Sequence, residues 1–193
     1  MAVGKRRFQA EDWLALGLKE LSARGPEAIK LAPICAAAGL TRGSFYYHFN
    51  DHDAFLVGMA ETWLETQTTN VAAILKGLRD PDVQAETLTD AAMSIDYKLE
   101  LGIRELARRN GDVADVVKRA DNMRLSVLMD LYAARFDLER PEAWDMAHLE
   151  YAAFAGLILI DPEMSEERQR DLAARFDLIM RTFFATRDLE TDA

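Results

Sequence analysis

The stretch GLTRGSFYYHF, residues 39–49, carries the most specific information in this chain. Phe45 and Phe49 lie four residues apart, so on a helix they share one face and can anchor it to a core. The opposite side presents hydroxyl, guanidinium and imidazole groups and no acidic group, from Thr41, Arg42, Ser44, Tyr47 and His48. Such a helix is suited to contact a polyanion, although the same residues also fit an ordinary amphipathic helix with an aromatic core.

The residues just before Thr41 predict a second helix and a turn. Residues 31–38 (LAPICAAA) favour a short helix, in which Pro33 is tolerated because amides of a first helical turn have no partner within the helix. Gly39 suits the left-handed residue that ends a helix, and Thr41 is a good N-cap for the next one. Two short helices across a glycine-containing turn are typical of a helix-turn-helix.

Helical periodicity continues through the rest of the chain, and we find no convincing run of alternating strand residues. We therefore expect an all-α protein of about nine helices, in which a three-helix head precedes a helical body. The longer expected helices lie at about residues 9–23, 53–78, 84–109, 113–136, 141–160 and 165–186. The boundary between head and body is expected between residues 52 and 53, which gives domains 1–52 and 53–193.

The charges are distributed unevenly between these two parts. The chain has 193 residues and a formal net charge of −10. Residues 1–52 hold seven basic and five acidic side chains, a net charge of +2, while the remaining 141 residues hold 16 basic and 28 acidic side chains, a net charge of −12. This asymmetry indicates a head that meets an anion and a body that does not.

Several classes of protein are excluded or disfavoured by what the sequence lacks. The longest apolar run, Tyr151–Ile160, falls short of the ~20 residues that span a bilayer, so we expect no membrane contact and a cytoplasmic location. A single cysteine, Cys35, excludes an internal disulfide and a cysteine zinc cluster. His48 and His52 are spaced like a metal pair, but the helix between them is expected to break at Asn50, so we expect neither metal nor cofactor.

The residues around this turn resemble a known family. The segment IKLAPICAAAGLTRGSFYYHFNDHDAFL (29–56), with LALGLKELSARG (14–25) before it, is similar to the DNA-binding head of TetR-type transcriptional regulators. Shared features are Ile34-Cys35, Ala38-Gly39 at the turn, and a recognition helix of the pattern small, Lys/Arg, Gly, Ser/Thr, apolar, Tyr, x, x, Phe. The resemblance covers about residues 10–56; the body resembles the family only in length and helix count.

The resemblance implies a homodimer that places two recognition helices in successive major grooves of palindromic double-stranded DNA. It also implies repression that a small-molecule effector releases. The choice of repression over activation follows only from how common repressors are in the family. The DNA-binding positions carried over from the family are Lys30, Thr41, Arg42, Gly43, Ser44, Tyr46, Tyr47, His48 and His52. Two depart from the family pattern: His52 stands where a lysine is usual, and Lys30 where a serine or threonine N-cap is usual.

Further contacts are expected outside the motif. The basic arm Lys5–Arg7 fits either a contact to the DNA backbone or minor groove, or a solvated terminus. Side chains that could face an effector, and that fit a core or solvent-facing role as well, are Trp63, Met93, Asp96, Tyr97, Arg104, Met123, Tyr132 and His148.

The dimer interface is expected near the C-terminus. Residues 151–160 are apolar on every face, and a helix of this kind must be buried on every side. Its small residues permit close helix approach, and the last helix adds a second apolar stripe, so two helices from each copy would form a four-helix bundle. The expected interface residues are Ala152, Ala153, Ala155, Gly156, Leu172, Phe176, Ile179 and Phe183. The alternative is that both stripes close the core of the monomer.

Two other functions stay open from the sequence. One is an architectural or division-linked DNA-binding protein that regulates no gene, which would occupy many weak genomic sites. The other is an all-helical enzyme, which the sequence disfavours because it shows no nucleophile elbow, no phosphate loop and no acid-rich metal signature.

Overall fold

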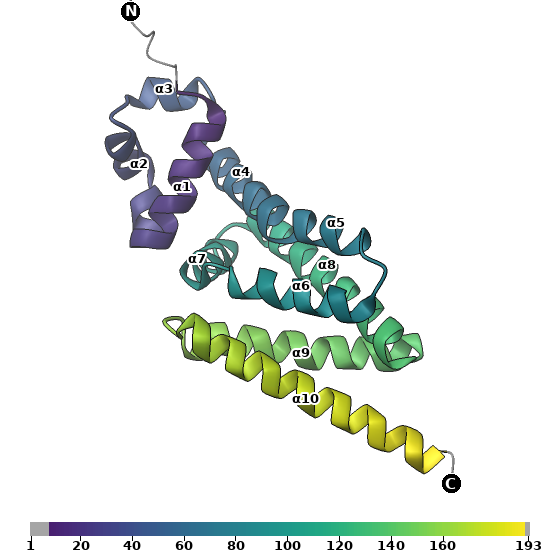
Figure 1. Ribbon diagram of the computed structural model, residues 1–193. Coiled ribbons are helices and arrows are strands. Elements are labelled where there is room, and N and C mark those ends of the chain that lie inside the picture. Colours follow the sequence, from purple (N-terminus) through teal and green to yellow (C-terminus); the bar gives the residue numbers. More distant parts are fainter. Residues whose placement is uncertain (1–7, 192–193) are drawn as a thin grey trace, which may run out of the picture. The chain divides into compact units, whose positions relative to one another are not determined.

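The computed structural model describes residues 8–191, and the side chains of residues 8–186. The described residues form helices and connecting turns without any strand (Figure 1), which confirms the all-α prediction. Helices α4 and α5 run on as one rod, so the described residues hold nine separate α-helices. No helix in the described part is both long and apolar enough to cross a membrane. The basic arm Lys5–Arg7 lies outside the described residues.

Packing divides the chain into two compact units, which we call the N-terminal unit (residues 8–70 and 96–122) and the C-terminal unit (71–95 and 123–191). The boundary expected between residues 52 and 53 falls inside the N-terminal unit, because α4 shares a core with the helices before it. The chain passes between the units after Asn70, after Ile95 and within helix α8.

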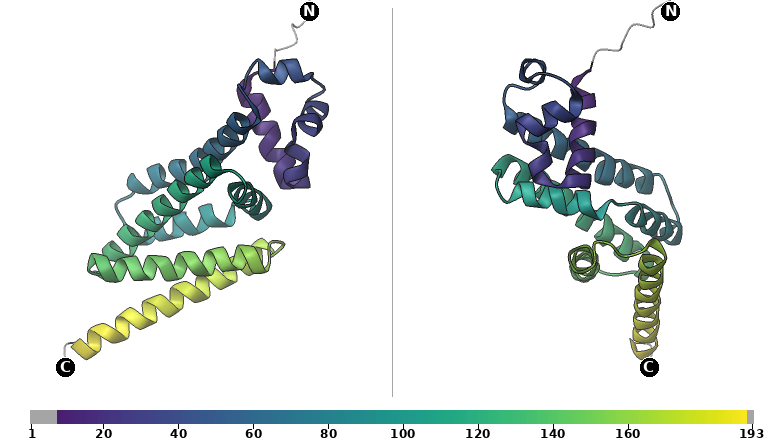
Figure 2. Two further views of the ribbon diagram at one scale, coloured as in Figure 1. Left: turned by 180° about the vertical axis from the view of Figure 1, so that it is seen from behind. Right: turned by 90° about the vertical axis from the view of Figure 1, so that its left-hand side faces the viewer.

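The N-terminal unit begins with the head helices and continues into what the sequence assigned to the body. Its elements are α1 (Ala10–Arg24), the 3-10 helix η1 (Pro26–Ile29), α2 (Leu31–Ala38), α3 (Arg42–Tyr46), α4 (His52–Leu64), the π-helical turn η2 (Glu65–Thr69), α7 (Tyr97–Ala107) and the first part of α8 (Gly111–Phe136). Figures 1 and 2 show α2 and α3 beside α1, with α4 leaving the head.

The core of this unit is aromatic and tightly closed. Trp13, Phe45, Phe55 and Met59 are completely buried in it, and Ile103 of α7 belongs to the same cluster. Helices α1 and α7 come close together at a glycine: a Cβ atom on Gly102 would lie 2.8 Å from Cγ of Leu21. Helix α7 therefore packs directly against α1 and shares the core of the head.

Polar contacts tie α7 to both of its neighbours in the N-terminal unit. Asp96 caps α7 by accepting from the amides of Lys98 and Leu99 at 3.0 and 3.1 Å, and it also accepts from the hydroxyl of Ser22 on α1. Arg104 joins the buried Glu100 at 2.8 Å to Asp121 of α8 at 2.7 Å. The expected helix 84–109 is therefore wrong, because Asp96 starts a new helix there.

The C-terminal unit comprises the residues of α5 (Asn70–Lys76) from Val71 onward, α6 (Pro81–Met93), the second part of α8, α9 (Arg140–Ile160) and α10 (Glu166–Thr191). Its core contains Leu128, Tyr132, Ala143, Ala147 and Phe184. Helices α9 and α10 run antiparallel and diverge away from the turn that joins them (Figures 1 and 2).

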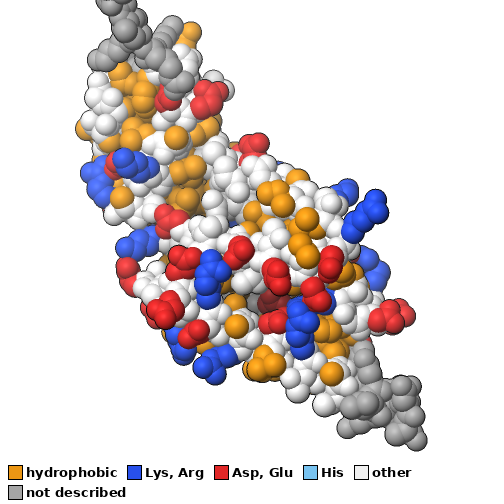
Figure 3. All heavy atoms as spheres, in the orientation of Figure 1, with side chains coloured by type: hydrophobic (Ala, Val, Ile, Leu, Met, Phe, Trp, Pro, Cys, Tyr) orange, Lys and Arg blue, Asp and Glu red, His pale blue; other side chains and the backbone are white. Residues whose placement is uncertain are grey.

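Ion pairs connect three helices of the C-terminal unit. Arg135 of α8 donates to Asp82 of α6 at 2.8 Å and pairs with Asp177 of α10 at 2.6 Å, while Arg181 reaches the same two carboxylates at 2.9 Å. The hydrogen bond from Arg135 is the main reason that the pKa of Asp82 lies below its ordinary value. In the view of Figure 3, acidic and basic side chains are intermixed on the surface.

Candidate nucleic-acid interface

The turn between α2 and α3 has the geometry that its residues predict. Gly39 adopts a left-handed conformation (φ 65°), and the amide of Leu40 donates to the carbonyl of Cys35 at 3.0 Å, which ends α2. The side chain of Thr41 then accepts from the amide of Ser44 at 3.3 Å and caps α3. These bonds fix the angle between the two helices of a helix-turn-helix.

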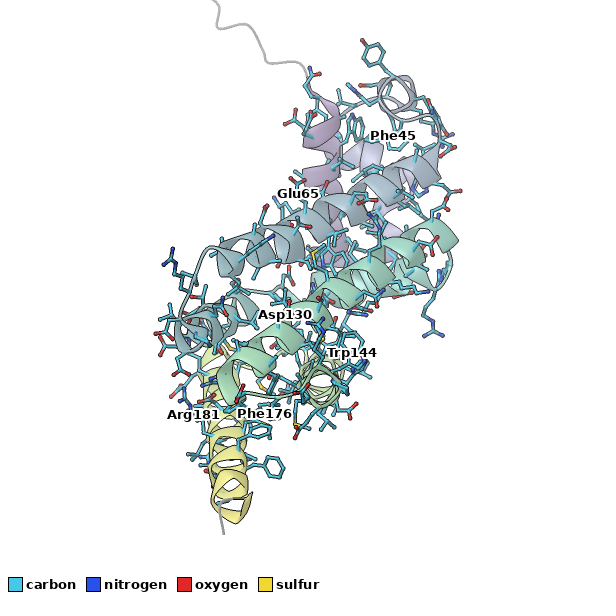
Figure 4. The ribbon with its side chains drawn as sticks, turned by 90° about the vertical axis from the view of Figure 1, so that its right-hand side faces the viewer. Phe45, Glu65, Asp130, Trp144, Phe176 and Arg181 are labelled. Carbon is cyan, nitrogen blue, oxygen red and sulfur yellow. The ribbon has the colours of Figure 1, made fainter. Side chains whose placement is uncertain are left out.

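Helix α3 is held to the head by its two phenylalanines. Phe45 is fully buried and makes edge contacts with Trp13 and Phe55, each with 5.3 Å between ring centroids. The amide of Phe49 donates to the carbonyl of Phe45 at 3.1 Å, so helical geometry continues past the end of α3 and brings the two rings into contact, with 5.1 Å between their centroids. Figure 4 labels Phe45 among the helices of the head.

The opposite side of α3 is open to solvent. Thr41, Arg42 and Gly43 are exposed, and the exposed fractions of Tyr46 and Tyr47 are 49% and 68%. Ser44 and His48 are half-buried beside them. The structure thus brings the predicted positions 41–44 and 46–48 together on one surface. An arginine can bind the guanine edge bidentately, while hydroxyl groups and a tyrosine can bind other base edges or phosphate oxygens.

The two positions that depart from the family pattern lie differently. His52 is half-buried, its Nε2 lies 2.9 Å from the carbonyl oxygen of Ile29, and its ring stacks near Phe45. This ring therefore joins α4 to η1, and the phosphate contact expected of His52 stays a prediction. Lys30 is exposed and pairs with Glu27 at 2.5 Å; its side chain makes no cap hydrogen bond at the start of α2.

The predicted effector-binding residues are divided between the two units. Trp63 and Tyr97 are buried in the N-terminal unit, where Arg104 is engaged in ion pairs and Asp96 caps α7. In the C-terminal unit, Met93 and Met123 are half-buried, Tyr132 donates to Glu150 at 2.6 Å, and exposed His148 lies 2.9 Å (Nδ1) from the carbonyl oxygen of Trp144. Neither unit brings all eight together.

The apolar residues predicted for a dimer interface are only partly covered within the chain. Ala152 and Ala153 are exposed, Ala155, Gly156, Leu172 and Phe176 are half-buried, and the exposed fractions of Ile179 and Phe183 are 59% and 51%.

Further apolar side chains are exposed along α9 and α10: Leu159 and Ile160, which end the predicted apolar run, and Trp144, Leu149 and Leu178, which sequence reasoning missed. Trp144 and Leu149 lie eight and three residues before Ala152, spacings that place residues on one helix face and could have indicated the longer face. Figure 4 labels Trp144 on α9 and Phe176 on α10.

Comparisons with known proteins agree with this geometry. Residues 14–59 match the family of bacterial regulatory proteins called the tetR family. The HTH-type transcriptional regulator CymR of Pseudomonas putida is 27% identical over 168 residues, which cover 79% of this chain and 82% of CymR.

Two solved structures share the fold. A transcriptional regulator from Saccharomonospora viridis in complex with choline has a TM-score of 0.75 at 14% identity, and the match covers 86% of this chain and 94% of that chain. A transcriptional regulator from a Rhodococcus species has a TM-score of 0.75 at 16% identity, over 90% of this chain and 96% of that chain.

The head is a helix-turn-helix DNA-binding domain whose recognition helix is anchored by aromatics and exposed on one side. The chain is a DNA-binding transcriptional regulator, and its residues 14–59 match the tetR family.

Proposed function

We propose that this regulator binds a palindromic operator as a homodimer and represses transcription until a small molecule releases it. In this proposal α3 of each copy enters the major groove, and the two half-sites lie about one helical turn, ~34–36 Å, apart. Arg42 reads a base edge, Tyr47 and His48 position the head on phosphates, and Gly43 allows close approach of the backbone. A protein that binds a bacterial operator acts in the cytoplasm.

The dimer is supported by the apolar surface of α9 and α10, and this is the observation that carries the proposal. Leu149, Leu159, Ile160 and Leu178 have exposed fractions of 60%, 72%, 82% and 65% in the single chain. Large apolar side chains that are exposed together along two neighbouring helices often mark an interaction site. Small exposed residues, Ala152 and Ala153, lie between the large ones and allow a second copy to pack closely.

Release by a small molecule is supported by the ligand of a regulator with the same fold and by the division of this chain into two compact units. The Saccharomonospora viridis regulator with the same fold was crystallised with choline. An effector weakens DNA binding only if it binds one conformation of the chain better than another, and only by that difference in affinity. The two compact units, joined at three places, provide a chain in which such conformations can differ.

The test places a charge in the proposed interface without disturbing the monomer. A Cβ atom on Gly156 would meet nothing within 4 Å, and Ala153 is exposed, so Gly156→Arg and Ala153→Glu should both fold. The matched control is Ile74→Glu, a charge on an exposed apolar position of α5 in the same unit. Operators are first selected from random DNA with the native protein.

We expect native protein and the Ile74→Glu control to sediment as dimers at micromolar concentration and to bind the selected operator. Both interface variants should sediment as folded monomers and lose most operator affinity, because one head contacts only one half-site. Native protein that sediments as a monomer and still binds a palindrome tightly would overturn the proposal.

A further inference from the structure

The rod formed by α4 and α5 contains one widened turn. At residues 65–69 the backbone is π-helical, and the amide of Asn70 donates to the carbonyl of Glu65, five residues earlier. Figure 4 labels Glu65 on this rod. A π-helical turn holds one residue more than the α-helical turn it replaces, and such turns are rare and often lie at functional sites. Regular α-helix precedes it at His52–Leu64 and follows it at Asn70–Lys76.

Side chains weaken the helix at the same place. The hydroxyl of Thr62 donates to the carbonyl of Gly58 at 2.9 Å, and that of Thr66 to the carbonyls of Thr62 and Trp63 at 2.8 and 3.3 Å. These bonds compete with backbone amides and bend helices. The local sequence ETQTTN, residues 65–70, contains three threonines, Thr66 among them, and an asparagine, which are poorer helix formers than alanine or leucine.

The helix on both sides of this turn is firmly held. Before it, Phe55, Met59 and Trp63 are buried in the core of the N-terminal unit. On the outside of α4, Asp53 accepts from Asn110 at 3.1 Å and Glu61 pairs with Arg119.

After the turn, Leu75 is buried, and the side-chain amide of Gln84 donates to the carbonyls of Leu75 and Leu78 at 3.1 and 2.9 Å. The division between the two compact units falls between Asn70 and Val71. The π-helical turn therefore lies directly before the place where the chain leaves one unit for the other.

We propose that the π-helical turn Glu65–Thr69 is a built-in pivot, at which the rod opens and bends while α4 stays fixed in the N-terminal unit. Bending there changes the direction of the rod without disturbing Phe55, Met59 or Trp63. The pivot as a local property does not depend on the dimer; its use in operator release rests on the proposed function. The pivot depends on the extra residue of the π-helical turn and on the threonine hydroxyls that bond to nearby carbonyls.

The test is amide hydrogen exchange on the full-length protein. In native protein, amides of residues 66–71 should exchange at least about tenfold faster than those of residues 57–64, because local openings need less free energy there. Deleting Thr66 removes the extra residue and its hydroxyl, keeps the helical phase of both flanks, and should bring exchange at the turn down to that of the flanks. Thr66→Ala should slow exchange by a smaller factor.

The matched control is Thr87→Ala in α6, whose hydroxyl donates to the carbonyl of Val83 at 2.8 Å in ordinary α-helix, and which should leave exchange at 66–71 unchanged. Native protein in which residues 66–71 exchange as slowly as 57–64 overturns the pivot. The native comparison and Thr66→Ala decide the question if the deletion does not fold. Operator binding of native protein is measured alongside, and its absence would overturn the proposed function and leave the pivot standing.

Discussion

The two compact units differ in how completely each one buries its own apolar residues. In the N-terminal unit the large apolar side chains are inside, and the exposed aromatic ones, Tyr46 and Tyr47, carry a hydroxyl and lie at the end of the recognition helix α3. In the C-terminal unit, large aliphatic and aromatic side chains of α9 and α10, such as Ile160 and Phe183, stay in solvent.

The proposed function accounts for this difference by two kinds of partner, DNA for one unit and a second copy for the other. A surface that binds DNA must be polar and cationic, and therefore cannot gain stability by burying apolar area against its partner. The recognition helix must then be held in place by a core that is complete within one chain. A surface that binds a second copy can itself be apolar, because the copy covers it. We therefore expect the two units to respond differently to the same kinds of substitution.

The largest effect is expected for Phe45→Ala. This ring is fully buried between Trp13 and Phe55, and removing a buried phenylalanine typically costs about 3–5 kcal/mol because it leaves a cavity. Thermal or urea unfolding should show this loss, and operator binding should fall with it. Tyr47→Ala, two positions away and mostly exposed, is the control and should change stability by less than about 0.5 kcal/mol.

A pair of glycines compares the packing of the two units directly. In α7 of the N-terminal unit, a Cβ atom on Gly102 would lie 2.8 Å from Leu21, so Gly102→Ala should cost about 1–3 kcal/mol through overpacking. In α9 of the C-terminal unit, a Cβ atom on Gly156 meets nothing within 4 Å, so Gly156→Ala should raise helix stability by about 0.5–1 kcal/mol. Equal changes in the melting temperature would contradict the comparison.

Arg42 tests whether the exposed side of α3 acts through DNA and not through the fold. Arg42→Ala should leave the free energy of unfolding unchanged within about 0.5 kcal/mol, since the residue is exposed. It should weaken operator binding by about 1–3 kcal/mol and relax the preference at one base pair. Tyr47→Phe should instead weaken binding to all sequences alike. Gel shifts with unchanged affinity and preference for Arg42→Ala would show that another residue reads the base.

The smallest effect is expected from Glu150 in the C-terminal unit. Burial raises the pKa of this carboxyl above its ordinary value although Tyr132 donates to it, so the folded chain keeps a proton that the unfolded chain has already lost. Its contribution to stability is present below the ordinary pKa, near 4.5, and is lost as the pH rises through the raised value.

Glu150→Gln keeps an acceptor for Tyr132 and removes the titration. Its stability at pH 7 should equal or exceed that of the native protein, and the decline above pH 4.5 should be shallower. Exposed Glu86→Gln on α6 is the control for losing one negative charge. A steeper decline with pH in Glu150→Gln than in native protein would contradict the sign of this argument.

How much of this was predictable from the sequence depended on how local each signal was. Gly39 and Thr41 act within a few residues, so the turn and the start of α3 could be predicted from them. Asp96 is equally local, and its capping of α7 was overlooked because the apolar spacing runs on through it.

Other features depend on distant partners and left no readable sign. The hydrogen bond of His52 to Ile29 and the packing of Gly102 on Leu21 join residues far apart in the sequence. The π-helical turn differs from α-helix by one residue per turn, a change that apolar periodicity over a short polar segment does not show.

Helix α8 has a consequence for engineering this regulator. It is a single helix, Gly111–Phe136, whose first part completes the core behind the recognition helix, with Val113, Val116 and Ala120, while its second part belongs to the other core. A chimaera that borrows a new operator specificity by exchanging only the N-terminal residues would join a foreign head to unmatched faces of α7 and α8. Grafting the recognition residues of α3 alone, or exchanging residues 96–122 together with the head, keeps that core matched.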